Sequence, residues 1–304
     1  MSHSTSIPPQ SPSPEIRIDE LCRRFIADYA LPRYRDRQGQ PSAEVHCFNS
    51  AIRLLIMHFG ELSVDRFRAL ALRTLREKMV TAGWSRKWIN KQIGRVRRMF
   101  RIGASWEMVD PDVLASLETV PPLSVGETSA PETEPRLAVS EDDLAAVREV
   151  MPQLHRDIFD LLLLCGARPG ELLLLTPGMI DRNGEIWRCD LRHHKTAKRG
   201  KTRTLFFIPK AQAILRRYLT LDPDKRLFSL NRNSFSTALK RHCERAGVPH
   251  FVPHQLRHTV ATKLADDLGI ESAQRLLGHS TAAMTAHYSR AAEKKAIAAV
   301  KRLG

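Results

Sequence analysis

A polar stretch near the middle of the chain, PPLSVGETSAPETEP at residues 121–135, divides two segments of different pattern. It is rich in Pro, Glu, Ser and Thr and poor in large apolar residues, a composition typical of an exposed linker between domains. For a chain of 304 residues, two domains are also the expectation from length. We therefore predict a linker over residues 121–137, between domains at 16–120 and 138–304. Residues 1–15, rich in Ser and Pro, are predicted to be a disordered leader.

The first segment has apolar residues at helical spacing throughout. Ser63, Ser85 and Asp110, the last followed by Pro111, are plausible residues at which helices begin. This pattern predicts a small all-helical domain, with helices near 18–29, 42–59, 63–82, 85–102 and 111–117.

The second segment mixes helices with a short β-like region. Ser140 precedes EDDLAAVREVM, with Asp143 three residues on, which resembles a capping box, and an apolar helix follows at 155–165. EIWRCDL (185–191) and RTLFFI (203–208) alternate like strands and flank the basic, glycine-containing HHKTAKRGKT, which predicts a hairpin. The fold class predicted is mainly α with a small β-sheet (α+β). Further helices are expected near 209–220, 232–246, 254–267, 270–277, 280–287 and 290–302.

The net charge of the chain makes a polyanion the first partner to consider. It is +15, and the sequence pI is about 10.1. Five scattered cysteines without a C-x-x-C pair argue against a disulfide framework and a cysteine zinc site, and no apolar run is long enough to span a bilayer. We expect a protein of a reducing cytoplasm, with no membrane partner and no small-molecule substrate.

One predicted helix, SRKWINKQIGRVRRMFRI at 85–102, separates apolar and basic residues on two faces. Ile89, Ile93, Val96 and Phe100 recur at intervals of four, three and four, so they share the face that packs. The opposite face carries positive charge, and almost no acidic residue within this segment is available to pair with it. A merely solvated face is the alternative. We predict DNA contact by Lys87, Lys91, Arg95, Arg98 and Arg101.

Three short segments of the second domain carry residues suited to one chemistry. CGARPGELLLL places Arg168 in a turn, with Glu171 at the start of an apolar helix. PHQLRHTVATKL places His254 and Arg257 on one helix face. LGHSTAAMTAHYSR places a histidine nine residues before Tyr288. Each segment alone has an ordinary structural explanation, but together they are harder to dismiss.

Cleaving a phosphodiester without a metal requires groups of these types. Two guanidiniums, from Arg168 and Arg257, can neutralise charge that develops on the non-bridging oxygens. A tyrosine hydroxyl, with a pKa near 10, can attack phosphorus if a base such as His254 takes its proton. The leaving 5′-oxygen needs a proton, which Lys195 in the hairpin loop could deliver.

In this order, R-P-G-E, H-K-T, H-Q-L-R-H-T, L-G-H-S and A-H-Y resemble the catalytic series of the tyrosine recombinase family, which includes phage integrases and Xer recombinases. The resemblance is strong over residues 138–304. Over about 16–120 it is looser, to the family's helical (SAM-like) core-binding domain. It implies a mixed catalytic domain of the DNA breaking-rejoining type.

The resemblance implies a role for each matching residue. Arg168 and Arg257 would clamp the phosphate, Lys195 would be the general acid, His254 would assist proton transfer, His279 would hydrogen-bond the phosphate and Tyr288 would be the nucleophile. Glu171 would support the catalytic side chains without itself contacting the phosphate. Pro209 lies farther beyond Lys195 than in many relatives, so Lys198 and Lys201 remain alternatives for the general acid.

The resemblance also implies partners and alternatives. It implies a 3′-phosphotyrosyl intermediate, no cofactor and no metal, and a homotetramer on two DNA duplexes with inverted-repeat half-sites. It also implies a bacterial protein that is associated with the nucleoid when bound. Alternatives are a catalytically silent DNA-binding relative, a type IB topoisomerase-like enzyme, and a metal hydrolase built on His254 and His258. The last lacks the glutamate that such a helix needs, since Gln255 follows His254.

Overall fold

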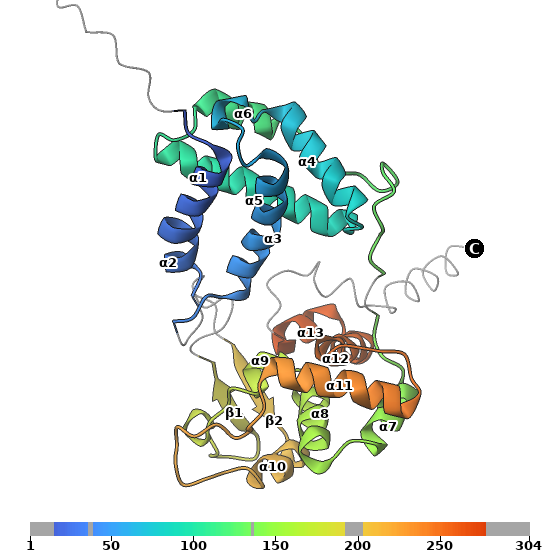
Figure 1. Ribbon diagram of the computed structural model, residues 1–304. Helices are drawn as coiled ribbons and strands as arrows, with labels where there is room; N and C mark the ends of the chain where they lie inside the picture. Colours follow the sequence, from blue (N-terminus) through green and yellow to red (C-terminus); the bar gives the residue numbers. More distant parts are fainter. Residues whose placement is uncertain (1–14, 36–38, 135–136, 192–202, 278–304) are drawn as a thin grey trace, which may run out of the picture. The chain divides into compact units, whose positions relative to one another are not determined.

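The computed structural model describes residues 15–35, 39–134, 137–191 and 203–277 (Figure 1). These residues are mostly helical, with one two-stranded antiparallel sheet. This confirms the fold class predicted from the sequence. Residues 1–14 of the predicted leader, the loop that holds Lys195, and the predicted helices at 280–287 and 290–302 lie outside the described residues.

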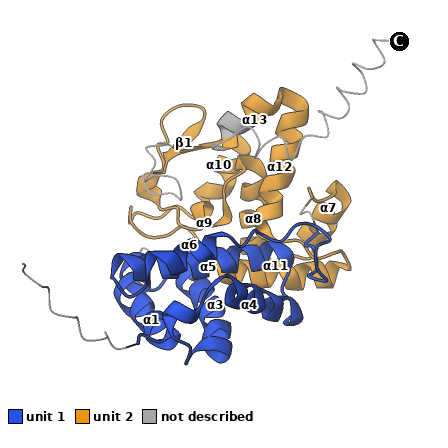
Figure 2. Cartoon of the chain, turned by 90° about the horizontal axis from the view of Figure 1, so that it is seen from above, with its two compact units in different colours: residues 1–134 blue, residues 135–304 orange. Residues whose placement is uncertain are grey.

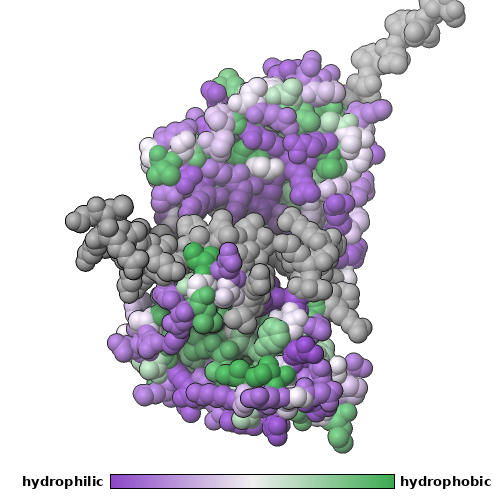
Figure 3. All heavy atoms as spheres, turned by 180° about the vertical axis from the view of Figure 1, so that it is seen from behind, coloured by the Kyte–Doolittle hydropathy of each residue, from purple (hydrophilic) through white to green (hydrophobic). Residues whose placement is uncertain are grey.

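The chain divides into two compact units, residues 1–134 and 135–304 (Figure 2). Hydrophilic residues cover much of the visible surface of each (Figure 3). Residues 121–134 of the predicted linker belong to the first unit and are exposed except at two points, Leu123 and Ala130. Leu123 is 2% exposed, and its backbone N–H and C=O both bond to the side-chain amide of Asn90, at 2.8 and 3.0 Å. Ala130 is also buried, and the N–H of Arg86 donates to the carbonyl of Pro131. These long-range anchors leave no signal in local composition.

The first unit contains helices in most of the predicted places, with two interruptions. The predicted helix at 18–29 is α1, then a π-helical turn, then the short α2. The helix predicted for 63–82 starts instead as a 3-10 turn and begins again at Ala69, because the backbone leaves the helical conformation at Phe67 (φ −84°, ψ 88°), whose side chain is buried, and is extended at Arg68. The helices are α1 (Ile18–Arg24), α2 (Leu31–Arg33), α3 (Ala43–Phe59), α4 (Ala69–Thr81), α5 (Arg86–Ser105) and α6 (Pro111–Glu118).

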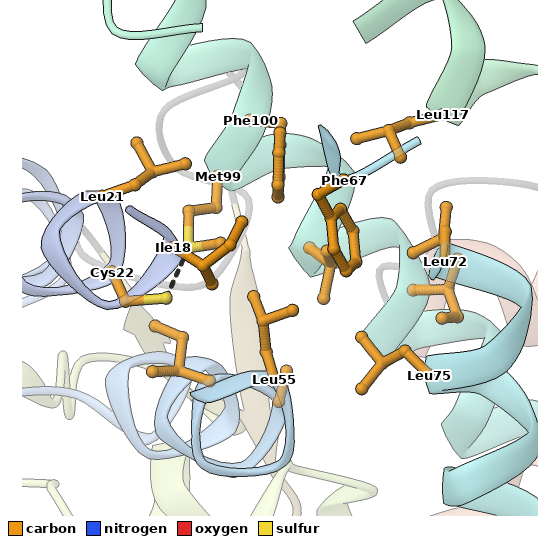
Figure 4. Packing of buried hydrophobic residues seen from close by; sticks show 14 of the residues in the cluster. Ile18, Leu21, Cys22, Leu55, Phe67, Leu72, Leu75, Met99, Phe100 and Leu117 are labelled. Atoms are coloured by element: carbon orange, nitrogen blue, oxygen red, sulfur yellow. Dashed lines mark hydrogen bonds between the residues drawn. The ribbon is translucent and has the colours of Figure 1, made fainter. Parts of the chain in front are cut away.

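The core of the first unit forms around the apolar face of α5. Phe100 stacks on Phe67, with ring centroids 5.1 Å apart, and Ile18, Leu55 and Leu72 surround this pair (Figure 4). Each such buried side chain contributes about 1.5–3 kcal/mol to folding. The four apolar residues predicted to share the packed face of α5 are all buried: Ile89, Ile93, Val96 and Phe100.

The second unit contains seven described helices and the sheet. Ser140 begins α7 as predicted, since its hydroxyl accepts the N–H of Asp143 at 3.1 Å. The helix predicted to start at Glu171 is only one turn long and ends at Leu172. It does not resume before Pro177, since Thr176, the residue before this proline, is extended. The helices are α7 (Glu141–Glu149), α8 (Gln153–Cys165), α9 (Pro169–Leu172), α10 (Pro209–Arg216), α11 (Arg232–Ala246), α12 (Pro253–Leu268) and α13 (Ile270–Leu277).

The predicted hairpin is present. β1 (Trp187–Asp190) pairs with β2 (Thr204–Phe207) in antiparallel register, from Trp187 opposite Phe207 to Asp190 opposite Thr204. Side chains alternate, so Trp187, Cys189, Leu205 and Phe207 face the core. The N–H of Leu191 donates to the carbonyl of Arg203 at 2.8 Å, which extends the ladder to the edge of the loop 192–202.

Candidate active site

A left-handed glycine sets the position of Arg168. The apolar helix α8 ends at Gly166, whose φ of +58° suits a residue without a side chain. Two residues later Arg168 is the N-cap of α9, and Pro169 follows at the first helical position. The turn therefore fixes the backbone of Arg168 between two helices.

Glu171 holds Arg168 from within the same helical turn. Its Oε1 accepts from Nη1 of Arg168 at 2.6 Å, and its Oε2 accepts from the backbone N–H of Arg168 at 3.0 Å. Burial would raise the pKa of Glu171, but Arg203, the Arg168 N–H and the Arg168 guanidinium together hold it below the usual value. The carboxylate therefore stays ionised near neutral pH.

Arg257 is buried where α12 approaches the Gly166 turn. It is 3% exposed, and its Nη1 and Nη2 donate to the carbonyls of Gly166, at 2.7 Å, and Leu277, at 2.5 Å. A buried guanidinium needs such partners to offset the loss of hydration. Because Gly166 lies two residues before Arg168, both arginines are anchored at the same turn.

His254 lies one turn before Arg257 on α12, close to the ring of His258, with centroids 5.0 Å apart. The residue remains solvent-accessible, yet partial burial lowers its pKa to about 4, and the charges of His258, Arg257 and Arg168 act in the same direction. The imidazole is therefore neutral at physiological pH and can accept a proton.

The comparison with protein families decides the family. The model of the phage integrase family matches residues 140–295, which is about half of the chain. The chain belongs to this family of tyrosine recombinases.

Curated relatives of this phage integrase family member are named tyrosine recombinases. XerC of Alcanivorax borkumensis is 33% identical over 147 residues, which cover 43% of this chain and less than half, 46%, of that protein. XerA of Thermococcus onnurineus is 28% identical over 282 residues, which cover 89% of this chain and 92% of that protein.

Solved structures share the fold of this family member at low identity. The Tn1549 transposon integrase in complex with transposon right end DNA has a TM-score of 0.70 at 18% identity and covers 95% of this chain and 99% of that one. A lambda integrase dimer bound to a COC′ core site has a TM-score of 0.68 at 15% identity, with coverage of 90% and 95%.

The described part of this phage integrase family member brings together four of the predicted site residues: Arg168, Glu171, His254 and Arg257. All lie inside the family match. Lys195, His279 and Tyr288 also lie inside it, but outside the described residues, as do Lys198 and Lys201.

Within the described ranges, no group of three or more His, Cys, Asp or Glu side chains is arranged to hold a metal. Nor does any described helix combine the length and apolarity needed to cross a membrane.

The basic face of α5 lies before the family match and is less uniform than predicted. Lys87, Lys91 and Arg98 are exposed. Arg95 forms two hydrogen bonds with Glu44 of α3, at 3.1 and 2.9 Å, and Arg101 pairs with Glu118 of α6 at 2.6 Å. No acidic residue lies within 85–102, as the sequence shows, and the partners of Arg95 and Arg101 come from other helices. DNA contact by this face stays a prediction.

Arg203 is a buried residue of the site that is not among the predicted site residues. From the sequence it is expected only to begin the second strand of the hairpin. It is 4% exposed, and its Nε lies 3.7 Å from Oε2 of Glu171. A signal was present, since Arg203 shares strand parity with Leu205 and Phe207, which face the core.

Proposed function

We propose that this chain is a site-specific recombinase that cleaves and rejoins duplex DNA through a covalent 3′-phosphotyrosyl intermediate at Tyr288. The observation that carries the proposal is the joint anchoring of Arg168 and Arg257 at the Gly166 turn, beside a neutral His254. Two fixed guanidiniums next to a proton acceptor suit a phosphodiester in its transition state.

The cleavage step conserves atoms and charge as follows. The Tyr288 oxygen attacks phosphorus and passes its proton to His254, while Arg168, Arg257 and His279 stabilise the phosphate oxygens. The bond from phosphorus to the 5′-oxygen breaks, and that oxygen takes a proton from a lysine of the loop, with Lys195 first and Lys198 or Lys201 as alternatives. Attack by a 5′-hydroxyl of another strand then reverses the step and releases Tyr288.

The two units would divide the work. Residues 16–120 would form the core-binding domain and follow the DNA backbone through the exposed basic side chains of α5, while residues 138–304 would form the catalytic domain. The DNA would carry inverted-repeat half-sites, with four protomers on two duplexes. The Tn1549 and lambda integrases, which share the fold, were solved in complex with DNA, which supports DNA as the partner of this chain.

The test is capture of the covalent intermediate. The full chain is incubated in EDTA with nicked duplexes of randomised sequence, and protein-bound DNA that survives denaturant is recovered and sequenced. We expect one enriched sequence family with wild type and no adduct with Tyr288→Phe. Tight binding of an enriched sequence without any adduct would instead support a DNA-binding relative without cleavage activity, and an adduct that needs a divalent metal would contradict the mechanism.

A further inference from the structure

Arg203 provides a second guanidinium next to the carboxylate that holds Arg168. The carboxylate of Glu171 lies between them, 2.6 Å from Nη1 of Arg168 and 3.7 Å from Nε of Arg203. The Arg203 side chain is 3% exposed, against 23% for Arg168. Of the two cations, Arg168 therefore has the greater access to solvent and to a ligand.

The geometry ties the orientation of Glu171 to Arg203. The Glu171 oxygen nearest to Arg203 is Oε2, which also accepts the backbone N–H of Arg168. Oε1 then faces the Arg168 guanidinium. Attraction of Oε2 toward Arg203 keeps the carboxylate in the orientation that holds Arg168.

Charge gives Arg203 a second effect. Arg168, Glu171 and Arg203 together carry one net positive charge, whereas Arg168 and Glu171 alone would be neutral. Because the site is partly desolvated, this charge favours the additional negative charge that a phosphate at Arg168 develops as it reacts, so we expect it to affect the rate of cleavage more than DNA affinity.

Arg203 also joins the Arg168 turn to the hairpin. Its carbonyl accepts from the N–H of Leu191 at 2.8 Å, so the backbone of Arg203 closes the end of the loop 192–202 while its side chain reaches Glu171. Residue 195, the first candidate for the general acid, belongs to that loop.

We infer that Arg203 is a positioning residue for DNA cleavage, which acts through Glu171 on Arg168 and anchors the hairpin to the same turn. The inference rests on the function proposed above. The Arg203 side chain is 3% exposed, so its removal should slow cleavage while DNA affinity is retained. A misplacement of about 1 Å in a catalytic group can cost about 100-fold in rate.

The experiment compares Arg203→Met and Arg203→Lys with wild type and with Arg188→Met. Arg188 lies on the same hairpin with its side chain 61% exposed, so it controls for loss of an arginine from this element. Each full-length variant is mixed in excess with the nicked duplex enriched by wild type. The dissociation constant, the single-turnover rate of adduct formation and the final amount of adduct are measured separately.

We expect Arg203→Met to slow adduct formation on the order of 100-fold, with unchanged affinity and an unchanged final amount. Arg203→Lys should recover part of the rate, and Arg188→Met should match wild type. A folding defect alone would lower the final amount of adduct and leave the rate of the folded fraction unchanged, and this result would overturn the inference. Wild-type rates in both Arg203 variants would overturn it as well. If Arg203→Met does not fold, Arg203→Lys is judged by the same criteria, and failure of both to fold would assign Arg203 a structural role only. Absence of any adduct with wild type would contradict the proposed function itself.

Discussion

The carboxylate of Glu171 binds Arg168 at two points, the guanidinium at 2.6 Å and the backbone N–H at 3.0 Å. The two contacts fix both the start of α9 and the direction of the side chain. An acidic residue at the third position of a helix is usually explained by capping alone. Here the same carboxylate also orients a residue proposed to hold the scissile phosphate.

Glu171→Gln tests that second role. The amide retains the shape of the side chain and can still accept the N–H of Arg168, but it loses the charge that attracts the guanidinium. We expect DNA cleavage to slow by about 10- to 100-fold with little change in thermal stability. Single-turnover cleavage and thermal unfolding check this, and a fall in unfolding temperature that fully accounts for lost activity would show that Glu171 only caps the helix.

Gly166→Ala should disturb Arg257 through the backbone. A Cβ at Gly166 would lie 2.6 Å from Cδ2 of Leu277 and 3.1 Å from Cγ1 of Val260, at a φ that is already unfavourable for alanine. Since Arg257 donates to both the Gly166 and the Leu277 carbonyls, we expect lower stability and slower DNA cleavage.

Gly247→Ala is the matched control for that change. Gly247 also ends a helix at positive φ (+67°), but a Cβ there meets nothing within 4 Å. It should cost about 1 kcal/mol of unfolding free energy from backbone strain alone and leave cleavage by the folded protein unchanged. Equal losses of stability and activity in the two variants would contradict a special role of the Gly166 contacts.

His254 should make stability depend on pH below neutrality. Its pKa is lowered to about 4, first by burial and then by nearby positive charge. Above the unfolded value of about 6.5 both states are neutral and His254 contributes nothing. As pH falls from about 6.5 toward 4, the unfolded chain binds a proton that the folded chain resists, so the folded state loses stability.

The measurement is the urea midpoint of wild type and His254→Asn near pH 7.5 and pH 5. We expect the variant to lose less stability on acidification than wild type. His155 and His242, whose pKa values burial also lowers, are present in both proteins and cancel in the comparison. Identical losses in both proteins would mean that His254 titrates normally.

Local pattern predicted much of the fold and part of the site, and the exceptions depend on long-range contacts. Helix periodicity located α3, α5 and α11 closely, and the spacing of the motifs led to Arg168, His254 and Arg257, which one turn brings together. The short interval from Arg168 to Glu171 could be interpreted because both lie in the same helical turn.

The pairing of charges could not be predicted in the same way. Arg95 finds Glu44 on a helix 51 residues away in the chain, and Arg203 reaches Glu171 only because the hairpin packs beside α9. The buried Leu123 and Ala130 likewise depend on a surface assembled from other helices. Composition averages over such single anchoring residues, so it predicts the exposure of the segment as a whole but not the two points at which it is held.

The basic face of α5 gives a prediction that separates binding from folding. Lys91 is exposed, whereas Arg95 lies between Glu44 and the rings of Trp88 and Phe48. We expect Lys91→Ala to weaken DNA binding and to reduce the salt dependence of log K by about one ion, without loss of stability. Arg95→Ala should instead destabilise the first unit, because it removes packed surface and leaves Glu44 without this partner.

Lys78→Ala is the control for charge alone. Lys78 is exposed on α4 and its removal changes the net charge of the same unit by the same amount as the Lys91 change. Binding to the enriched duplex, titrated at several salt concentrations for each variant, distinguishes a specific contact from a general field. If Lys78→Ala and Lys91→Ala weaken binding equally, the attraction comes from the total charge of the unit, and the face of α5 makes no specific contact with DNA. If only Lys91→Ala weakens binding, a phosphate lies against this face. A field spread over the unit would not discriminate between two lysines that are both exposed.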